Sequence, residues 1–146
     1  MKKLEVLLAV AIVVALILSV YIFFQSKTSF KKVKIGNVTI DAEVADTTLK
    51  RIKGLMFRQS LADKNGMLFL FDTDDYHGIW MMNMSFPIDI IWINSEHKIV
   101  DIVKDAQPCR IICPVYKSKE KTRYVLEVNA CFTDKYSVDI GDSVKF

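Results

Sequence analysis

The sequence has few of the residues and motifs on which enzyme active sites usually depend. It has two histidines, three cysteines and five glycines in 146 residues. It contains no phosphate-binding P-loop, no glycine-rich dinucleotide fingerprint and no nucleophile elbow, and no internal repeat. Most common enzyme classes therefore have no support, and although an unknown reaction stays open, the sequence favours a protein that is not an enzyme.

Common metal sites are also missing. The acidic turn Asp72-Thr-Asp-Asp75 lacks the glycine and the distal glutamate of a calcium loop. Cys109 and Cys113 have no second matching cysteine pair, which a zinc site of this type would need. We therefore expect no resident cofactor, with one exception that is considered below.

A long uncharged run is present near the N-terminus. Nineteen residues, Val6 to Phe24, carry no charge, and as a helix they measure about 28 Å, close to the thickness of a bilayer core. The run is longer than the apolar part of a signal peptide and lacks a small-residue cleavage site. The sequence predicts an N-terminal signal anchor (1–26), which crosses the bilayer through residues 6–24, and a basic linker (27–34).

Lysines flank both ends of this run. A literal positive-inside count places the globular domain in the cytoplasm, but long domains translocate largely regardless of charge. We attribute most of the net charge of +3 to contact with lipid head groups, and we expect no nucleic-acid binding. Cysteine usage, described below, favours an extracytoplasmic domain.

Residues 35–146 have the pattern of a mainly β domain. Val38 to Val44 alternate apolar and polar side chains, which is typical of a half-buried strand, and Gly36-Asn37 predicts a hairpin. Thr47 to Leu55 predicts a short helix with Leu49, Ile52 and either Leu55 or Met56 facing inward. Further strands are expected at residues 67–71, 88–93, 99–103, 124–128 and 143–146. The expected fold is mainly β (α+β), a small barrel-like or strongly curved antiparallel or mixed sheet with one or two short helices.

Several short motifs resemble one family. They are Gly54-Leu-Met-Phe-Arg58, Gly66-Met-Leu-Phe69, Trp80-Met81-x-Asn83, Pro87-x-Asp89, Pro108-Cys109, Tyr116 and Leu126-Glu127. In this order and spacing, over residues 38–146, they resemble the Domain of unknown function 192 family. The resemblance implies a compact β-rich domain, often exported or membrane-tethered, without an established activity. Met84 and Cys131 depart from the pattern, which usually has a small hydroxyl residue and a glycine there.

The cysteines suggest an oxidising location. A turn framed by Pro108 and Pro114 would bring Cys109 and Cys113 within the Cα distance that a disulfide needs, and a disulfide favours an extracytoplasmic domain. A metal site or a catalytic thiolate are the alternatives. Cys131 is expected to be a small buried residue, with an intermolecular disulfide left open.

Charged residues within apolar segments are the main candidates for a site. Asp89 and Glu127 alternate with inward-facing residues, and Arg58 follows the short helix. One interpretation is a salt bridge of Arg58 with Asp89 or Glu127, because an isolated buried charge is costly. The other is a cleft in which these three residues, with Trp80 and Asn83, bind a polar ligand or a partner.

A methionine-rich segment provides the remaining alternative. On an extended strand Trp80, Met82 and Met84 would share one face. Met82, Met84 and His77 then form a candidate Cu(I) site, while the structural alternative has the methionines filling the core. The function expected is a membrane-anchored extracytoplasmic binding or accessory module for a small polar ligand or protein partner; the alternatives are a Cu(I) carrier and an enzyme of unknown reaction.

Overall fold

The computed structural model describes residues 2–24 and 28–146, without the side chains of residues 2, 4, 6 and 21–24. The elements in chain order are α1 (Lys2–Phe24), β1 (Phe30–Ile35), β2 (Val38–Ala45), α2 (Thr48–Lys53), β3 (Asn65–Asp75), β4 (Gly78–Trp80), β5 (Ile88–Ile93), β6 (Ile99–Ala106), β7 (Val115–Lys117), β8 (Thr122–Asn129), α3 (Phe132–Tyr136) and β9 (Val144–Lys145). The expected combination of many short strands with short helices is confirmed.

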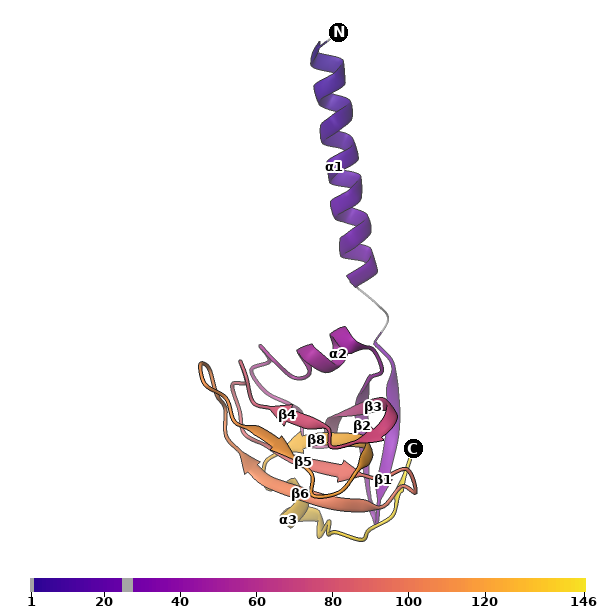
Figure 1. The fold of residues 1–146 in the computed structure, drawn as a ribbon, viewed down its shortest axis with the longest axis vertical. Helices are drawn as coiled ribbons and strands as arrows, with labels where there is room; N and C mark the ends of the chain where they lie inside the picture. The colour runs from indigo at the N-terminus through magenta and orange to yellow at the C-terminus, as the bar shows by residue number, and fades with distance from the viewer. Residues whose placement is uncertain (1, 25–27) are drawn as a thin grey trace.

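Seven strands form one curled, mixed sheet in the order β6-β5-β8-β3-β2-β1-β9, and β4 and β7 form a separate two-stranded sheet. Within the large sheet, neighbours are antiparallel except β2 and β3, which are parallel. The large sheet curves into a half-barrel, with β4 beside it and α3 at the far end from α2 (Figure 1). A parallel pair needs a crossover connection, and residues 46–64 provide it with α2 included.

Each face of the half-barrel has its own apolar core. Leu68, Leu126 and Ile91 belong to a first cluster that also includes Phe132 of α3. Alternate positions of the same strands contribute Phe69, Val125, Ile90 and Trp92 to the second cluster, which also includes Ile79 of β4 and Met81 of the loop after it. Because side chains alternate across a strand, the register of β3, β5 and β8 decides which face every residue in the sheet occupies.

One predicted boundary requires a correction. Residues 30–34 were expected in the basic linker but belong to β1, where Val33 and Ile35 are buried and the lysines point to solvent. Because its lysines are exposed, this half-buried strand has the composition of a polar linker.

The orientation of α2 also differs from the expectation. Leu49 and Ile52 were expected to face inward, but they are 58% and 53% exposed. The hydroxyl oxygen of Thr47 caps the helix by accepting a hydrogen bond from the Lys50 amide.

The described side chains of α1 are all exposed. Within the described residues, no helix is both long and apolar enough to cross a membrane. The predicted junction between anchor and linker, at residues 26 and 27, lies outside the part of the chain that the structure describes.

The methionine-rich segment is not one extended strand. β4 ends at Trp80, and Asn83 has a φ of 54°, in the left-handed region where asparagine is among the tolerated residues. This turn breaks the expected alternation, so that Met81 and Met84 are both buried in the second cluster. The expected common face of Trp80, Met82 and Met84 was therefore wrong.

Candidate ligand groove

A groove lies over the second core cluster, between α2 and the β4–β7 pair. Its outer part has a volume of about 310 Å³ and is lined by Thr48, Arg51, Ile52, Phe69, Phe71, Gly78, Ile79, Trp80 and Val115. This volume is at the lower end of the range of small-molecule sites, and most of the lining is apolar, as in such sites. A second cavity of about 40 Å³ shares six of these residues and continues inward to Leu55, Met84 and Glu127.

Glu127 is the polar group at the inner end of the groove. The residue is 4% exposed, and among the described residues none forms a hydrogen bond with its carboxyl. Burial raises the pKa of Glu127 to about 8, against a smaller lowering effect from the charge of Arg58. The carboxyl is consequently protonated at neutral pH, when it can donate one hydrogen bond and accept others.

The register of the sheet explains why Glu127 points into the groove. Glu127 pairs with Met67 of β3, and Met67 pairs with Glu43 of β2. The three side chains therefore form a row on one face, and the backbones of Glu43 and Glu127 are about 10 Å apart, two strand spacings. Glu43 and Glu127 thus share a face, with one strand between them.

Arg58 extends from the crossover to the near end of this row. Its Nη2 lies 2.7 Å from Oε2 of Glu43, and its Nη1 contacts Oε1. The hydrogen bond from Arg58 lowers the pKa of Glu43, and the pKa of Arg58 is raised by the same bond. One interpretation of the sequence was a salt bridge of Arg58 with Asp89 or Glu127; the observed partner is Glu43. Glu43 lies at the end of the row that Arg58 reaches, and Glu127 lies two strands further along the same row.

Asp89 lies on the opposite face of the sheet. It pairs in register with Val128, which belongs to the first cluster, whereas Glu127 pairs with Ile90 of the second. The Asp89 carboxylate accepts hydrogen bonds from the Asp105 amide at 3.0 Å, from the Thr133 amide at 2.9 Å and from the Thr133 hydroxyl at 2.7 Å. Asp89 thus joins β6 and α3 to β5, and the expected convergence of Arg58, Asp89 and Glu127 does not occur.

Arg51 gives the outer groove its positive charge. Its Nη1 donates to the Leu70 carbonyl at 2.7 Å and to the Asp46 carbonyl at 3.1 Å, and its guanidinium lies 5.3 Å from the centre of the Phe71 ring. These partners are neutral groups, and Arg51 forms no salt bridge among the described residues, although its charge contributes to the lowered pKa of Asp46.

Two glycines shape the groove. Gly54 ends α2 with φ 47° and ψ −133°, a conformation that residues with a Cβ rarely adopt. At Gly78 a Cβ atom would lie 2.6 Å from Cγ1 of Val115. The close approach of β4 to β7, and with it the outer wall of the groove, requires glycine at position 78.

Two further candidates, Trp80 and Asn83, have different positions. Trp80 is 42% exposed and lines both parts of the groove. Asn83 instead holds two loops together through its backbone, with its amide 2.9 Å from the Cys109 carbonyl and its carbonyl 3.0 Å from the Phe57 amide. Trp80 therefore belongs to the groove, and Asn83 belongs to its support.

The Cu(I) candidates are also separated by their environments. The His77 ring stacks on Phe71 with centroids 3.5 Å apart, and its Nε2 lies 2.9 Å from the Thr73 carbonyl. Met84 is buried beside the inner cavity. The backbone of Met82 forms an isolated parallel β-bridge with the backbone of Cys109. Among the described residues there is no group of three histidine, cysteine or acidic side chains that could hold a metal ion.

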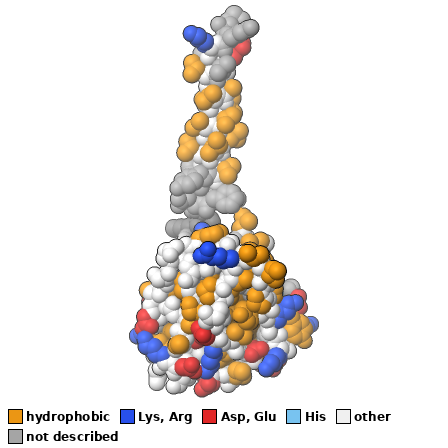
Figure 2. Space-filling view, turned by 90° about the vertical axis from the view of Figure 1, so that its left-hand side faces the viewer, with side chains coloured by type: hydrophobic (Ala, Val, Ile, Leu, Met, Phe, Trp, Pro, Cys, Tyr) orange, Lys and Arg blue, Asp and Glu red, His pale blue; other side chains and the backbone are white. Residues whose placement is uncertain are grey.

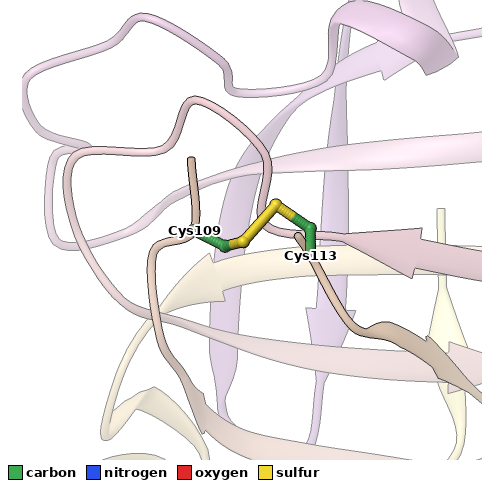
Figure 3. The surroundings of a disulfide bond; sticks show 2 residues. All are labelled: Cys109 and Cys113. Carbon is green, nitrogen blue, oxygen red and sulfur yellow. A yellow bond between two sulfur atoms is a disulfide. The ribbon is translucent and has the colours of Figure 1, made fainter. Parts of the chain in front are cut away.

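Cys109 and Cys113 form a disulfide with Cα atoms 5.5 Å apart (Figure 3). Cys131 was expected to be buried, but its thiol is free and exposed. Cys131 has a φ of 64°, in the left-handed region that glycine adopts without strain. The turn before α3 therefore explains why a glycine is common at this position in the family that the sequence resembles.

Sequence reasoning identified Glu127 and Trp80 but missed most of the groove. The missed residues include Arg51, Gly78 and Val115, and the short strands β4 and β7 gave no periodic signal over three residues each. One signal was available for Arg51: a positive charge in the helix that precedes the Gly54 motif.

The fold and the groove define a small half-barrel domain that has a ligand-sized groove ending at a buried acid. Residues 31–146 match DUF192, a family described as "Uncharacterized ACR". The chain belongs to this family. The resemblance predicted from the sequence motifs over residues 38–146 is thus confirmed and extends to β1.

Curated relatives have the same uncharacterised status. A UPF0127 protein of Thermococcus gammatolerans is 32% identical over 106 residues, which cover 71% of this chain and 65% of that protein, somewhat less than two thirds of its length. The UPF0127 protein PH1112 of Pyrococcus horikoshii is 26% identical, with 73% of this chain and 87% of that protein covered. A solved structure of a protein of unknown function from Novosphingobium aromaticivorans has a TM-score of 0.76 and 29% identity, covering 84% of this chain and 89% of that chain.

Proposed function

We propose that this protein is a membrane-anchored, extracytoplasmic binding module that takes a small, largely apolar ligand into its groove. The ligand's polar group forms a hydrogen bond with the carboxyl of Glu127. The observation that carries the proposal is this carboxyl, which belongs to a residue only 4% exposed, lines the inner end of an apolar groove and forms no hydrogen bond with the described residues. Its oxygens are not completely enclosed, since no fully buried side-chain oxygen or nitrogen among the described residues lacks a partner, so the carboxyl is free to form a hydrogen bond with a ligand in the groove.

Sequence features support the anchor and the location. The absence of a spanning helix applies to the described residues alone. In the full sequence the run from Val6 to Phe24 has no charge, and as a helix it would match a bilayer in length. The disulfide between Cys109 and Cys113 is typical of oxidising compartments. Together these features favour an extracytoplasmic domain tethered at its N-terminus.

The binding part can be tested with 2-heptanone, a ketone that accepts but does not donate hydrogen bonds. The full chain is purified in detergent micelles, and binding is followed by the fluorescence of Trp80, which lines the groove. We expect binding at pH 6, where Glu127 is protonated and donates, and weaker binding at pH 9.5, above its pKa of about 8.

Variants identify the group responsible. Glu127→Gln keeps a donor and should bind 2-heptanone at both pH values, whereas Glu127→Leu should lose roughly 1–3 kcal/mol of binding free energy. Glu96→Gln, on an exposed turn, is the matched control and should behave like the wild type. Binding that is unaffected by Glu127→Leu, or absent from the wild type at pH 6, would contradict the proposal.

The anchor and the topology have their own tests. The protein should stay in the membrane pellet after carbonate extraction, and its release would contradict an anchor. The exposed thiol of Cys131 is a natural reporter of topology. A membrane-impermeant maleimide should label Cys131 on intact cells, and labelling only after lysis would place the domain in the cytoplasm.

A further inference from the structure

Three loops meet at the end of the half-barrel that contains α2. The Phe57 amide donates to the Asn83 carbonyl at 3.0 Å, the Asn83 amide donates to the Cys109 carbonyl at 2.9 Å, and the Cys109 amide donates to the Met81 carbonyl at 3.0 Å. The loop after α2, the loop after β4 and the disulfide loop are therefore fixed relative to one another. The disulfide closes the third loop between Cys109 and Cys113 (Figure 3).

The tips of these loops are apolar and exposed. Phe57 is 69% exposed, Ile111 is 88% exposed and Ile112 is 91% exposed. The next apolar side chains toward the groove are Leu49 and Ile52 of α2, at 58% and 53%. On the side of the domain drawn in Figure 2, hydrophobic side chains gather in the upper and central part, with a basic side chain at the top. Clustered exposed apolar residues of this kind mark an interaction surface.

The same end of the domain is the one nearest to α1 along the chain. The Val44 amide donates to the Ser29 carbonyl at 2.8 Å, so the chain enters the sheet beside the start of the crossover that contains α2. Four Cα steps separate Phe24 from Thr28, and a chain of this length spans at most about 14 Å. Figure 1 shows α2 and the loop before β7 at this end, and α3 at the other.

Basic side chains accompany the apolar tips. Lys53 ends α2, and Arg110 lies beside Ile111 within the disulfide loop. Neither has a carboxylate partner among the described residues. Apolar side chains next to positive charges that form no salt bridge match the chemistry of a bilayer surface with anionic head groups.

We infer that this end of the domain docks on an anionic lipid bilayer, into which Phe57, Ile111 and Ile112 insert. The groove, whose outer wall contains Ile52 and Val115, then opens beside the membrane surface and takes its apolar ligand from the lipid phase. This inference rests on the proposed anchor and the proposed groove, and it adds the orientation of the domain and the source of the ligand.

Tryptophan quenching by brominated lipids tests the docking. The full chain is reconstituted in phosphatidylcholine and phosphatidylglycerol vesicles, with and without brominated acyl chains, as Ile112→Trp and as Ile140→Trp. Ile140 is a matched control because it is 62% exposed and belongs to the segment between α3 and β9, at the far end of the domain (Figure 1). Trp80 and Trp92 give the same background in both variants.

We expect the added emission of Ile112→Trp to shift to the blue and to be lost on bromination, while that of Ile140→Trp is unchanged. Lys53→Glu with Arg110→Glu, added to Ile112→Trp, should restore emission in the anionic vesicles. If the chain floats with the vesicles but quenching is equal at positions 112 and 140, the docking inference is wrong while the proposed anchor stands. The exposed apolar loop tips would then be assigned to contact with a protein partner. A chain that does not float with the vesicles would overturn the proposed anchor and this inference together, while the binding of 2-heptanone in micelles is independent of both.

Discussion

The carboxylate of Glu43 accepts both arms of the Arg58 guanidinium, and the second arm lies 2.7 Å from its oxygen. This pairing leaves Glu127, on the same face of the sheet, without a direct partner but within the electrostatic influence of Arg58. The guanidinium of Arg58, which would otherwise be available for a salt bridge with Glu127, is therefore paired with Glu43. Burial is the main cause of the raised pKa of Glu127, and the charge of Arg58, which is paired with Glu43, opposes it only in part.

Removing the charge of Arg58 should raise the pKa of Glu127 further above its value of about 8, since the lowering effect of Arg58 is lost. Arg58→Met is the variant, and carbon-13 NMR titration of the glutamate carboxyls is the measurement. Lys135→Met removes an exposed lysine that pairs with Asp63 and should leave the Glu127 titration unchanged. A lower pKa in Arg58→Met would show that Arg58 does not act through its charge.

Glu127→Gln should change how stability depends on pH. The folded pKa of Glu127 lies above the ordinary value of 4.5, at about 8, so the folded state binds the proton more tightly than the unfolded state does. The stability of the wild type therefore declines as pH rises from about 4.5 to about 8. At pH 9 the variant should be more stable than the wild type, by up to about 5 kcal/mol, and near pH 4 this difference should disappear. Urea unfolding at both pH values measures it, and a variant that is the less stable protein at pH 9 would contradict the burial argument.

Gly78→Ala should disrupt the outer wall of the groove. The new methyl group would meet Val115 at 2.6 Å, and such overpacking costs about 1–3 kcal/mol. Both the melting temperature and the affinity for 2-heptanone should fall. Val115→Ala in the same chain removes the clashing atom and should restore most of the stability; a double variant as unstable as Gly78→Ala would point to a cause other than this contact.

Asp89→Asn should destabilise the fold without weakening binding in the groove. The side-chain amide of asparagine has only one hydrogen-bond acceptor, its oxygen. Asp89 now accepts from the backbone amides of Asp105 and Thr133 and from the Thr133 hydroxyl, so at least one of these donors would lose its partner. The expected cost is about 2–4 kcal/mol, measured by urea unfolding. Affinity for 2-heptanone, measured where the variant is folded, should equal that of the wild type, because Asp89 faces away from the groove.

The sequence was sufficient to predict the larger elements of the fold. Alternation in Val38–Ala45 and the apolar run in β5 predicted strands that the structure contains, since burial on one or both faces leaves a periodic trace. The strands β4 and β7 were missed because three residues carry no period. Leu49 and Ile52 were placed inward because helical spacing shows which residues share a face, but not what that face contacts.

The candidate site was less predictable for a related reason. Glu127 could be singled out as an acid between apolar neighbours, but its opposite orientation to Asp89 depends on strand register. Glu43 looked like a solvent-facing residue of an alternating strand. Only the crossover brings Arg58 over it, and no local pattern in the sequence encodes that long-range contact.

The parallel pairing of β2 and β3 separates two parts of the molecule that can vary independently. The sheet supplies Glu43 and Glu127, while the crossover between β2 and β3, residues 46–64, supplies α2, whose Arg51 and Ile52 line the groove. A surface connection tolerates changes in length and sequence better than the sheet does. Substitutions within this segment would therefore change the size and polarity of the groove while the acid at its inner end stays in place.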